Sequence, residues 1–229
     1  MKNTLIFTLA LCMLSCTTEK NNVFINGNIK GLKKGTVYLL QAKDSVFKTL
    51  DSVVVNGKSN FTLSCSLDEP EVLFIKLNKN DNDTAMVDFF ASEGTTTLTS
   101  TLKNFIYDAD IQGSAQQNLL NEYRKMMYAY RNKNLELIEQ HLQAQIDKDT
   151  LAIDSLQQSY NNYLKSQYRY SLNYAVTHSD SEVAPYIALS EMPDATAKVL
   201  DTLYSSLTEK VKNSKYGKLL KETLDSEKK

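Results

Sequence analysis

The first half of the mature chain is marked by apolar residues at every second position. Between residues 23 and 113, short runs with this alternation are separated by turn-forming glycine, asparagine and proline. A period of two is typical of β-strands that bury one face. The predicted strands cover residues 23–29, 36–40, 47–55, 61–65, 72–77, 86–90 and 95–102, with a last short strand ending at Ile111.

The spacing of these strands indicates how they pair. Asn56-Gly57 separates two of them, and Asn-Gly is a favoured two-residue turn between antiparallel strands. Many short strands at roughly ten-residue intervals are typical of an all-β domain. We therefore expect an antiparallel β-sandwich or an open barrel.

After Gly113-Ser114 the apolar residues recur at every third or fourth position, which is the period of an amphipathic helix. One stripe covers residues 119–146, in which residues 132–134 could introduce a break, and a second covers residues 151–174. Shorter helices are expected after Ser179-Asp180-Ser181, after Pro193-Asp194 and after Ser214. The predicted fold class is α+β, with an all-helical region built around a long antiparallel helix pair.

The N-terminus carries the pattern of an export signal. Lys2 precedes an apolar run at residues 5–14, about half the ~20 residues that a membrane-spanning helix needs. Ser15 before Cys16 resembles the lipobox, at which a signal peptidase cuts before the cysteine that carries lipid. The alternative is an ordinary secretory signal in which this cysteine occurs by chance.

These features divide the chain into a lipoprotein signal peptide (1–15), a tether (16–22), a β-rich domain (23–113) and a helical region (114–229). Acyl chains hold a protein on a bilayer without a spanning segment, since each buried CH₂ contributes about 0.8 kcal/mol. We therefore expect the membrane to be a partner through lipid on Cys16. The expected location is the cell envelope, on the outer membrane facing the periplasm.

Charge and cysteine content restrict the function further. Without Lys2 the mature chain has 25 basic and 27 acidic residues, and this balance favours neither nucleic acid nor anionic lipid as a partner. With Cys12 removed and Cys16 lipidated, Cys65 is left without a partner for dithiol exchange. Cys65 alternates with Phe61 and Leu63, which predicts a buried structural thiol.

Other chemistry receives little support from the sequence. His141 and His178 have no metal-binding spacing, and no nucleophile elbow is present, so neither a catalytic residue nor a metal or cofactor site is predicted. The oxygen-rich residues 80–84 lack the Gly and Glu that complete a calcium loop and are interpreted as a polar turn.

Tyrosine is the unusual component of the helical half. Five tyrosines fall within one predicted helix, and their apolar bodies and polar tips suit either packing inside a helical hairpin or a surface for a ligand or partner. The candidates for such a surface are Tyr160, Tyr163, Tyr168, Tyr170 and Tyr174.

Short motifs along the mature chain resemble a lipoprotein domain of unknown function. In Bacteroidetes-type lipoproteins this domain precedes a helical segment and then a thioredoxin-like, ResA-type (AhpC/TSA) disulfide reductase domain. The matching motifs are Phe24-Ile25-x-Gly27-x-Ile29, Gly35-x-Val37-Tyr38-Leu39, Asp51-Ser52-Val53-x-Val55-Asn56-Gly57-Lys58-x-x-Phe61, Pro70, Gly113-Ser114, Ser181-x-x-Ala184 and Ser214-x-Tyr216-Gly217-Lys218-x-Leu220.

The departure from that architecture matters for function. The sequence contains no Trp-Cys-x-x-Cys site, so the resemblance implies export, lipidation and fold but no redox activity for this chain. We expect a non-catalytic, lipid-anchored binding or scaffolding module. The alternatives are an accessory factor for a separate thioredoxin-like reductase and a glycan- or peptide-capturing lipoprotein of an uptake system.

The anchor can be tested by substituting its attachment point. Cys16→Ala is expected to release the protein from membranes or to leave its signal peptide uncleaved, because the acyl chains on Cys16 are the expected anchor. Membrane fractionation and intact-mass measurement distinguish these results. A wild-type protein without acyl mass in the soluble fraction would show that the lipobox interpretation is wrong.

Overall fold

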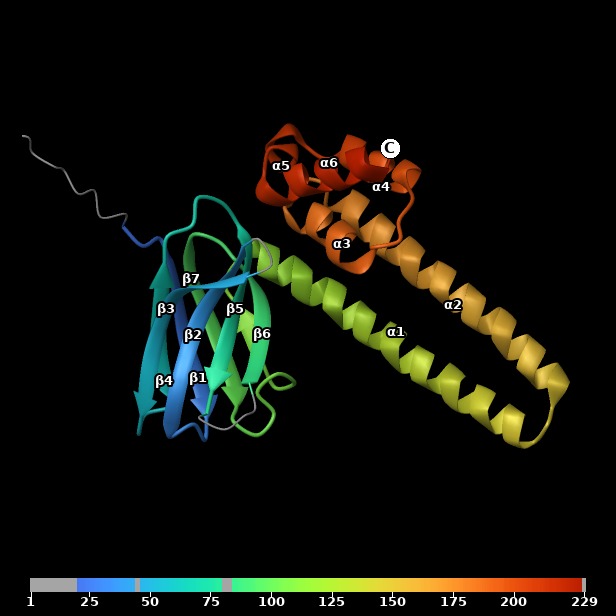
Figure 1. Cartoon of the computed structure of the whole chain (residues 1–229), viewed down its shortest axis with the longest axis horizontal. Coiled ribbons are helices and arrows are strands. Elements are labelled where there is room, and N and C mark those ends of the chain that lie inside the picture. The colour runs from blue at the N-terminus through green and yellow to red at the C-terminus, as the bar shows by residue number, and fades with distance from the viewer. Residues whose placement is uncertain (1–19, 44–45, 80–83, 228–229) are drawn as a thin grey trace, which may run out of the picture.

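The computed structural model describes residues 20–43, 46–79 and 84–227. It consists of a β-sandwich followed by a helical region whose first two helices extend far from the sandwich (Figure 1). Cys16 and residues 80–83 of the oxygen-rich turn lie outside the described residues.

In the part of the chain that the structure describes, eight strands form the sandwich, at the positions that the alternating pattern predicts. They are β1 (Val23–Lys30), β2 (Lys34–Lys43), β3 (Val46–Asn56), β4 (Asn60–Cys65), β5 (Glu71–Asn78), β6 (Thr84–Ala91), β7 (Gly94–Thr101) and β8 (Asp110–Gln112). They make two four-stranded sheets in the orders β4-β1-β7-β8 and β3-β2-β5-β6. The sandwich alternative of the prediction is therefore confirmed.

One pair of strands in the otherwise antiparallel sandwich is parallel. β1 lies between β4 and β7 and pairs with β7 in parallel, with Ile25 opposite Thr96. The pairing arises because β7 follows two strands of the other sheet and then crosses over to join β1. Alternation within a strand reports which face is buried and carries no information on the direction of the neighbouring strand.

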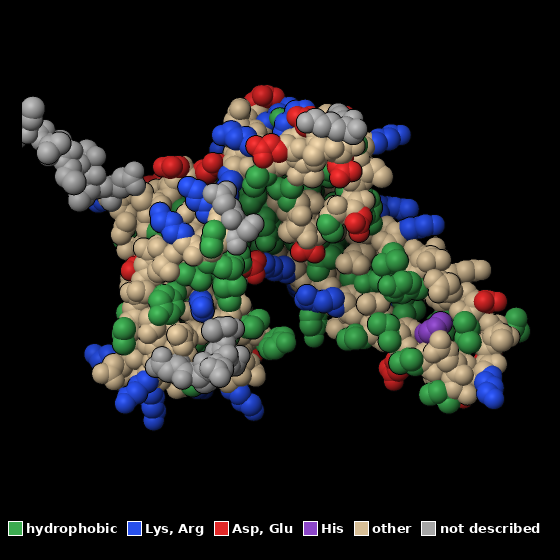
Figure 2. Space-filling view, viewed as in Figure 1, with side chains coloured by type: hydrophobic (Ala, Val, Ile, Leu, Met, Phe, Trp, Pro, Cys, Tyr) green, Lys and Arg blue, Asp and Glu red, His purple; other side chains and the backbone are tan. Residues whose placement is uncertain are grey.

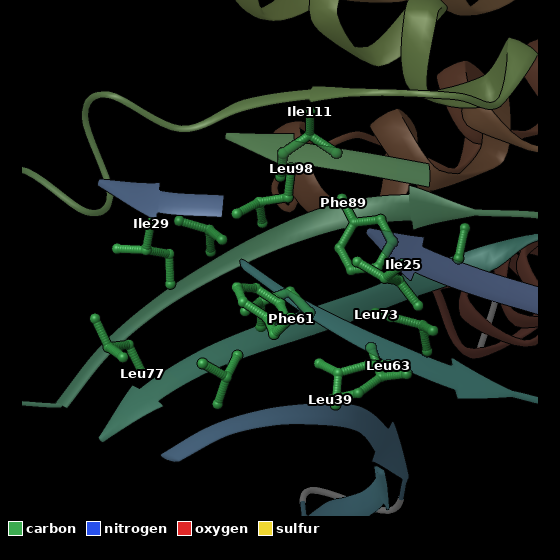
Figure 3. Close-up of a cluster of buried hydrophobic side chains, with 14 of the residues drawn as sticks. Ile25, Ile29, Leu39, Phe61, Leu63, Leu73, Leu77, Phe89, Leu98 and Ile111 are labelled. Atoms are coloured by element: carbon green, nitrogen blue, oxygen red, sulfur yellow. The ribbon is translucent and has the colours of Figure 1, made fainter. Parts of the chain in front are cut away.

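The core of the sandwich lies between the two sheets. Figure 3 shows Ile25, Leu63, Leu73, Phe89 and Leu98 converging from five different strands. These side chains are each at most 1% exposed. Their burial is the main favourable term for this half of the chain, at about 25 cal/mol per Å² of apolar surface.

The helical region contains α1 (Ala115–Ile146), α2 (Thr150–Thr177), α3 (Val183–Glu191), α4 (Ala197–Ser206), α5 (Glu209–Lys212) and α6 (Lys215–Glu227). Ser114 and Asp149 cap α1 and α2, because their side-chain oxygens accept hydrogen bonds from Gln117 N and Ala152 N. The long antiparallel pair that the sequence predicts is thus α1 and α2.

Two details of the predicted helices differ in the structure. α1 continues through residues 132–134 without a break, since asparagine costs a helix less than 1 kcal/mol and Leu137 beyond it is buried. The helix expected after Pro193-Asp194 is split, because buried Leu207 is extended and Thr208 caps α5.

A second core joins the helices to the outer face of the β3-β2-β5-β6 sheet. At its centre the ring of Phe90, from β6, lies 5.6 Å from the rings of both Tyr186 and Tyr216, which are 5.2 Å apart. All three meet edge to face, the geometry that aromatic quadrupoles favour. This trio fixes α3 and α6 against β6.

Side chains from the helices also complete the hydrogen bonding of the sheet at this junction. Ser114 Oγ donates to the Phe90 carbonyl at 2.8 Å, and the Phe90 N–H donates to Gln117 Oε1 at 2.7 Å. The Val72 N–H donates to the Tyr216 hydroxyl at 2.8 Å, a buried contact. The first turn of α1 therefore covers the open edge of β6, which would otherwise be available for pairing with another strand.

Removing the Tyr216 hydroxyl tests this junction. Tyr216→Phe is expected to lower the free energy of unfolding by about 1–3 kcal/mol, because the buried Val72 N–H loses its acceptor. Chemical denaturation measures the change. Tyr186→Phe is the matched control, since the Tyr186 hydroxyl makes only a 3.4 Å contact with Asp88, and an equal loss in both variants would contradict the proposed role of the Val72 contact.

Candidate functional site

The candidate site is the arm, defined as residues 126–168 of α1, α2 and their connecting turn. α1 has 32 residues and α2 has 28, so at about 1.5 Å per residue the pair is more than 40 Å long. Figure 1 shows α3–α6 packed beside the end of α2 near the sandwich, while the rest of the pair extends away from both. Most of the arm is therefore only two helices thick.

One face of each helix forms the seam between α1 and α2. Where the arm meets the helical core, Tyr123 packs on Tyr170 and Tyr174 at ring distances of 6.1 and 5.4 Å. Further out, the Tyr130 ring lies 6.0 Å from the Tyr163 ring, and its hydroxyl is 3.0 Å from Ser166 Oγ. Beyond this point, the buried side chains of the seam are Leu137 and Ala144.

A second apolar stripe on the arm remains exposed. Ile138 and Leu142 on α1 are 45% and 54% exposed, and Tyr160 and Leu164 on α2 are 37% and 44% exposed. Together with half-buried Leu156 they make up the arm face. Figure 2 shows hydrophobic side chains gathered along both helices of the arm.

The arm face contains a groove between the two helices. The groove has a volume of about 230 Å³, and Leu137 and His141 contribute to its lining beside four of the arm-face residues. A wider hollow of about 430 Å³ between α1 and α2 is lined in part by Met126, Lys133 and Asn162. These openings arise because two helices alone leave grooves along their seam that no third helix fills.

Four of the five tyrosines that the sequence offered as one surface form a run of ring contacts that passes through Tyr130, and most of this run is packed in the seam. Tyr174 is buried, and half-buried Tyr170 and Tyr163 belong to the seam. Burial raises the pKa of Tyr174 and of Tyr170 above the ordinary value, which agrees with a packing role. Tyr160 lies on the arm face, while Tyr168 lines a shallow hollow on α2 with Leu164 and Leu172.

The surface that the sequence did not identify is carried by aliphatic residues. Ile138, Leu142 and Leu164 belong to the stripes that predicted the packed faces of the two long helices, and the structure leaves them exposed. Helical periodicity shows that a face is apolar and does not show whether another element covers it. The available signal was the width of the apolar face, because adjacent Leu137 and Ile138 lie on two neighbouring stripes and Leu142 continues the second.

Cys65 is a buried thiol, as the strand pattern predicts. It is 5% exposed in the sandwich core, and its pKa is raised from 9.0 to about 11 by burial and by the carboxylates of Glu71 and Asp51. A thiol that stays protonated at neutral pH is a poor nucleophile. This environment does not favour exchange with a partner's disulfide.

His178 differs from the solvated residue that its polar neighbours suggested. It is half-buried at the C-cap of α2, its ring is 4.2 Å from that of Tyr174, and its Nδ1 lies 2.8 Å from the Tyr174 carbonyl oxygen. Within the described residues, His, Cys, Asp and Glu side chains make no group of three that could hold a metal ion. Nor does that part of the chain contain a helix long and apolar enough to cross a membrane.

Comparison with known proteins bears on the first half of the chain. A family model described as "Domain of unknown function (DUF4369)" matches residues 23–120, which include the sandwich and the first turns of α1. No curated protein matches the chain. Among solved structures, sea bream transthyretin in complex with thyroxine has 14% identity and a TM-score of 0.32, with 41% of this chain and 97% of that chain covered.

The reactivity of Cys65 provides a test of its burial. A thiol probe is expected to label native protein at pH 8 about 100-fold more slowly than denatured protein, since a pKa higher by about two units reduces the thiolate fraction by that factor. The native rate should continue to rise from pH 9 to 11, where the denatured rate levels off. Cys65→Ser measures labelling at other sites, and fast native labelling at pH 8 would contradict the buried environment.

Proposed function

We propose that the protein is a lipid-anchored component of the cell envelope that acts as a non-catalytic binding or scaffolding module, with the arm as its docking element. The observation that carries the proposal is the apolar arm face, exposed on a rigid element built of only two helices. Soluble proteins seldom expose contiguous apolar side chains unless another molecule covers them.

The junction supports a scaffolding role because it fixes the arm to the sandwich. Arg124 forms an ion pair with Asp88 of β6, and Asn121 Nδ2 donates to the Ile111 carbonyl at 2.9 Å, so the base of α1 is held by both sheets. Burial of Phe90 among α3 and α6 adds apolar contact to these bonds. An arm held in this way presents its face in a defined direction.

The first described residues and the arm lie on different sides of the sandwich. The described chain begins at Lys20, beside the sandwich, and Figure 1 shows it entering β1 on the side of the sandwich away from the arm. Lipid on Cys16 would therefore hold the sandwich at the membrane and leave the arm face accessible. The sequence feature behind this anchor is the lipobox-like Ser15-Cys16 after the apolar run.

The alternatives receive less support. An accessory role in thiol-disulfide exchange would need a reactive thiol, and burial in the sandwich core protects Cys65. Capture of glycans would favour exposed aromatic side chains, whereas of the five candidate tyrosines only Tyr160 is exposed.

Photo-crosslinking in the native envelope tests the docking role of the arm. A benzophenone amino acid at Leu142, 54% exposed on the arm face, is expected to give covalent adducts with a protein. The same probe at Val54, 75% exposed on β3, is the matched control and should give none. Leu164→Glu should suppress the Leu142 adducts, because a charge on the arm face opposes burial.

The result that overturns the proposal is equally specific. If Leu142 gives no protein adduct, or gives the same adducts as Val54, the arm face is not a docking surface. Adducts that persist unchanged in Leu164→Glu would also exclude docking through this face.

A further inference from the structure

We propose that the arm faces of two copies of this chain pair with each other, antiparallel about a two-fold axis, and complete a four-helix bundle. The inference rests on the proposed docking role of the arm and names its occupant. It follows from three properties of the arm: the thickness of its core, the distribution of its charges and the position of its groove.

The arm has no third or fourth helix to cover its exposed apolar face. Helical bundles bury their seams between three or four helices, and in the arm α1 and α2 have only each other. Ile138, Leu142, Tyr160 and Leu164 project beside the seam, and each is more than a third exposed. A second helical hairpin laid on this face would supply the missing layer.

Charge divides the arm into two halves of opposite sign. The half near the sandwich, residues 126–134 and 159–168, has three basic and no acidic residues. The half at the tip, residues 135–158, has five acidic residues and one lysine. Lys133 has an ion-pair partner in Glu136, while Arg131 and Lys165 are exposed.

This division makes the surface complementary to itself. When two arms lie antiparallel, the acidic tip of each meets the basic half of the other, whereas a parallel arrangement would place like charges together. A contact in which the same surface serves both partners is the property of a two-fold dimer. Complementary charges at the rim of an apolar contact set its direction.

Charged residues on either side of Tyr160 define how the two arms would align. On α2, Asp154 lies six residues before Tyr160 and Lys165 five residues after it, about 8–9 Å in either direction at 1.5 Å per residue. A two-fold axis at the level of Tyr160 and perpendicular to the arm sets α2 against α2 of the other copy. At about 100° per residue, both side chains lie about 120–140° around α2 from Tyr160, so they flank the contact at its rim. There Asp154 of each chain is level with Lys165 of the other, and the two grooves beside Tyr160 adjoin.

Charge reversal tests this arrangement on the full-length, detergent-solubilised protein by sedimentation velocity over a dilution series. Wild type is expected to sediment as a dimer. Asp154→Lys and Lys165→Glu should each raise the dissociation constant about tenfold, because each sets like charges opposite one another. The double variant restores opposite charges and should return the dissociation constant close to that of wild type.

Apolar and remote variants provide the controls. Leu142→Glu should raise the dissociation constant by more than about tenfold, since it introduces a charge into the buried centre of the contact. Lys58→Glu, at an exposed position in the turn between β3 and β4, should leave it unchanged. Circular dichroism of every variant is expected to show unchanged helical content, because the substitutions are at exposed positions.

The outcomes separate this inference from the proposed function. A monomer throughout the dilution series, a dimer insensitive to all arm substitutions, or a double variant weaker than both single variants would overturn the antiparallel dimer. If the chain is monomeric and the Leu142 probe still forms adducts with a different protein in the envelope, the docking function holds and the second copy is the wrong occupant. Adducts with the mass of two chains support both.

Discussion

The contact between Phe90 and the paired rings of Tyr186 and Tyr216 fixes the two halves of this protein to each other. Phe90 belongs to β6, an edge strand, and its N–H and carbonyl are bonded by Gln117 and Ser114 at the start of α1. The aromatic contact and the hydrogen bonds meet at one residue. These contacts at the edge strand β6 therefore set the direction in which α1 leaves the sandwich.

The exposure of the arm follows from this attachment. α3, α4 and α6 fold back over the base of the hairpin and bury Tyr123 and Tyr174, but they are short and cover only that end. The remaining turns of α1 and α2 continue outward with apolar side chains on more faces than a single seam can bury. Exposed Leu142 and Leu164 are thus a consequence of helix length relative to the elements available to cover them.

Charged and apolar side chains are distributed differently along the arm. The apolar side chains run along its length, while the sign of the charges changes near its middle, around Leu137 and Tyr160. A surface of this kind gains affinity from its apolar part and direction from its charges. In the sandwich the apolar side chains are instead concentrated between the sheets, and Cys65 among them is protected from chemistry by its neighbours.

The sequence alone determined the elements, because local patterns depend on nearest neighbours. Alternation located the eight strands of the described residues, and the change to a helical period after Gly113-Ser114 marked the start of α1. What only the tertiary structure decided concerns partners distant in the chain. The parallel pairing of β1 with β7 and the exposure of Ile138 are both of this kind. A stripe of apolar residues reports that a face can be buried, and whether it is buried depends on which other elements reach it.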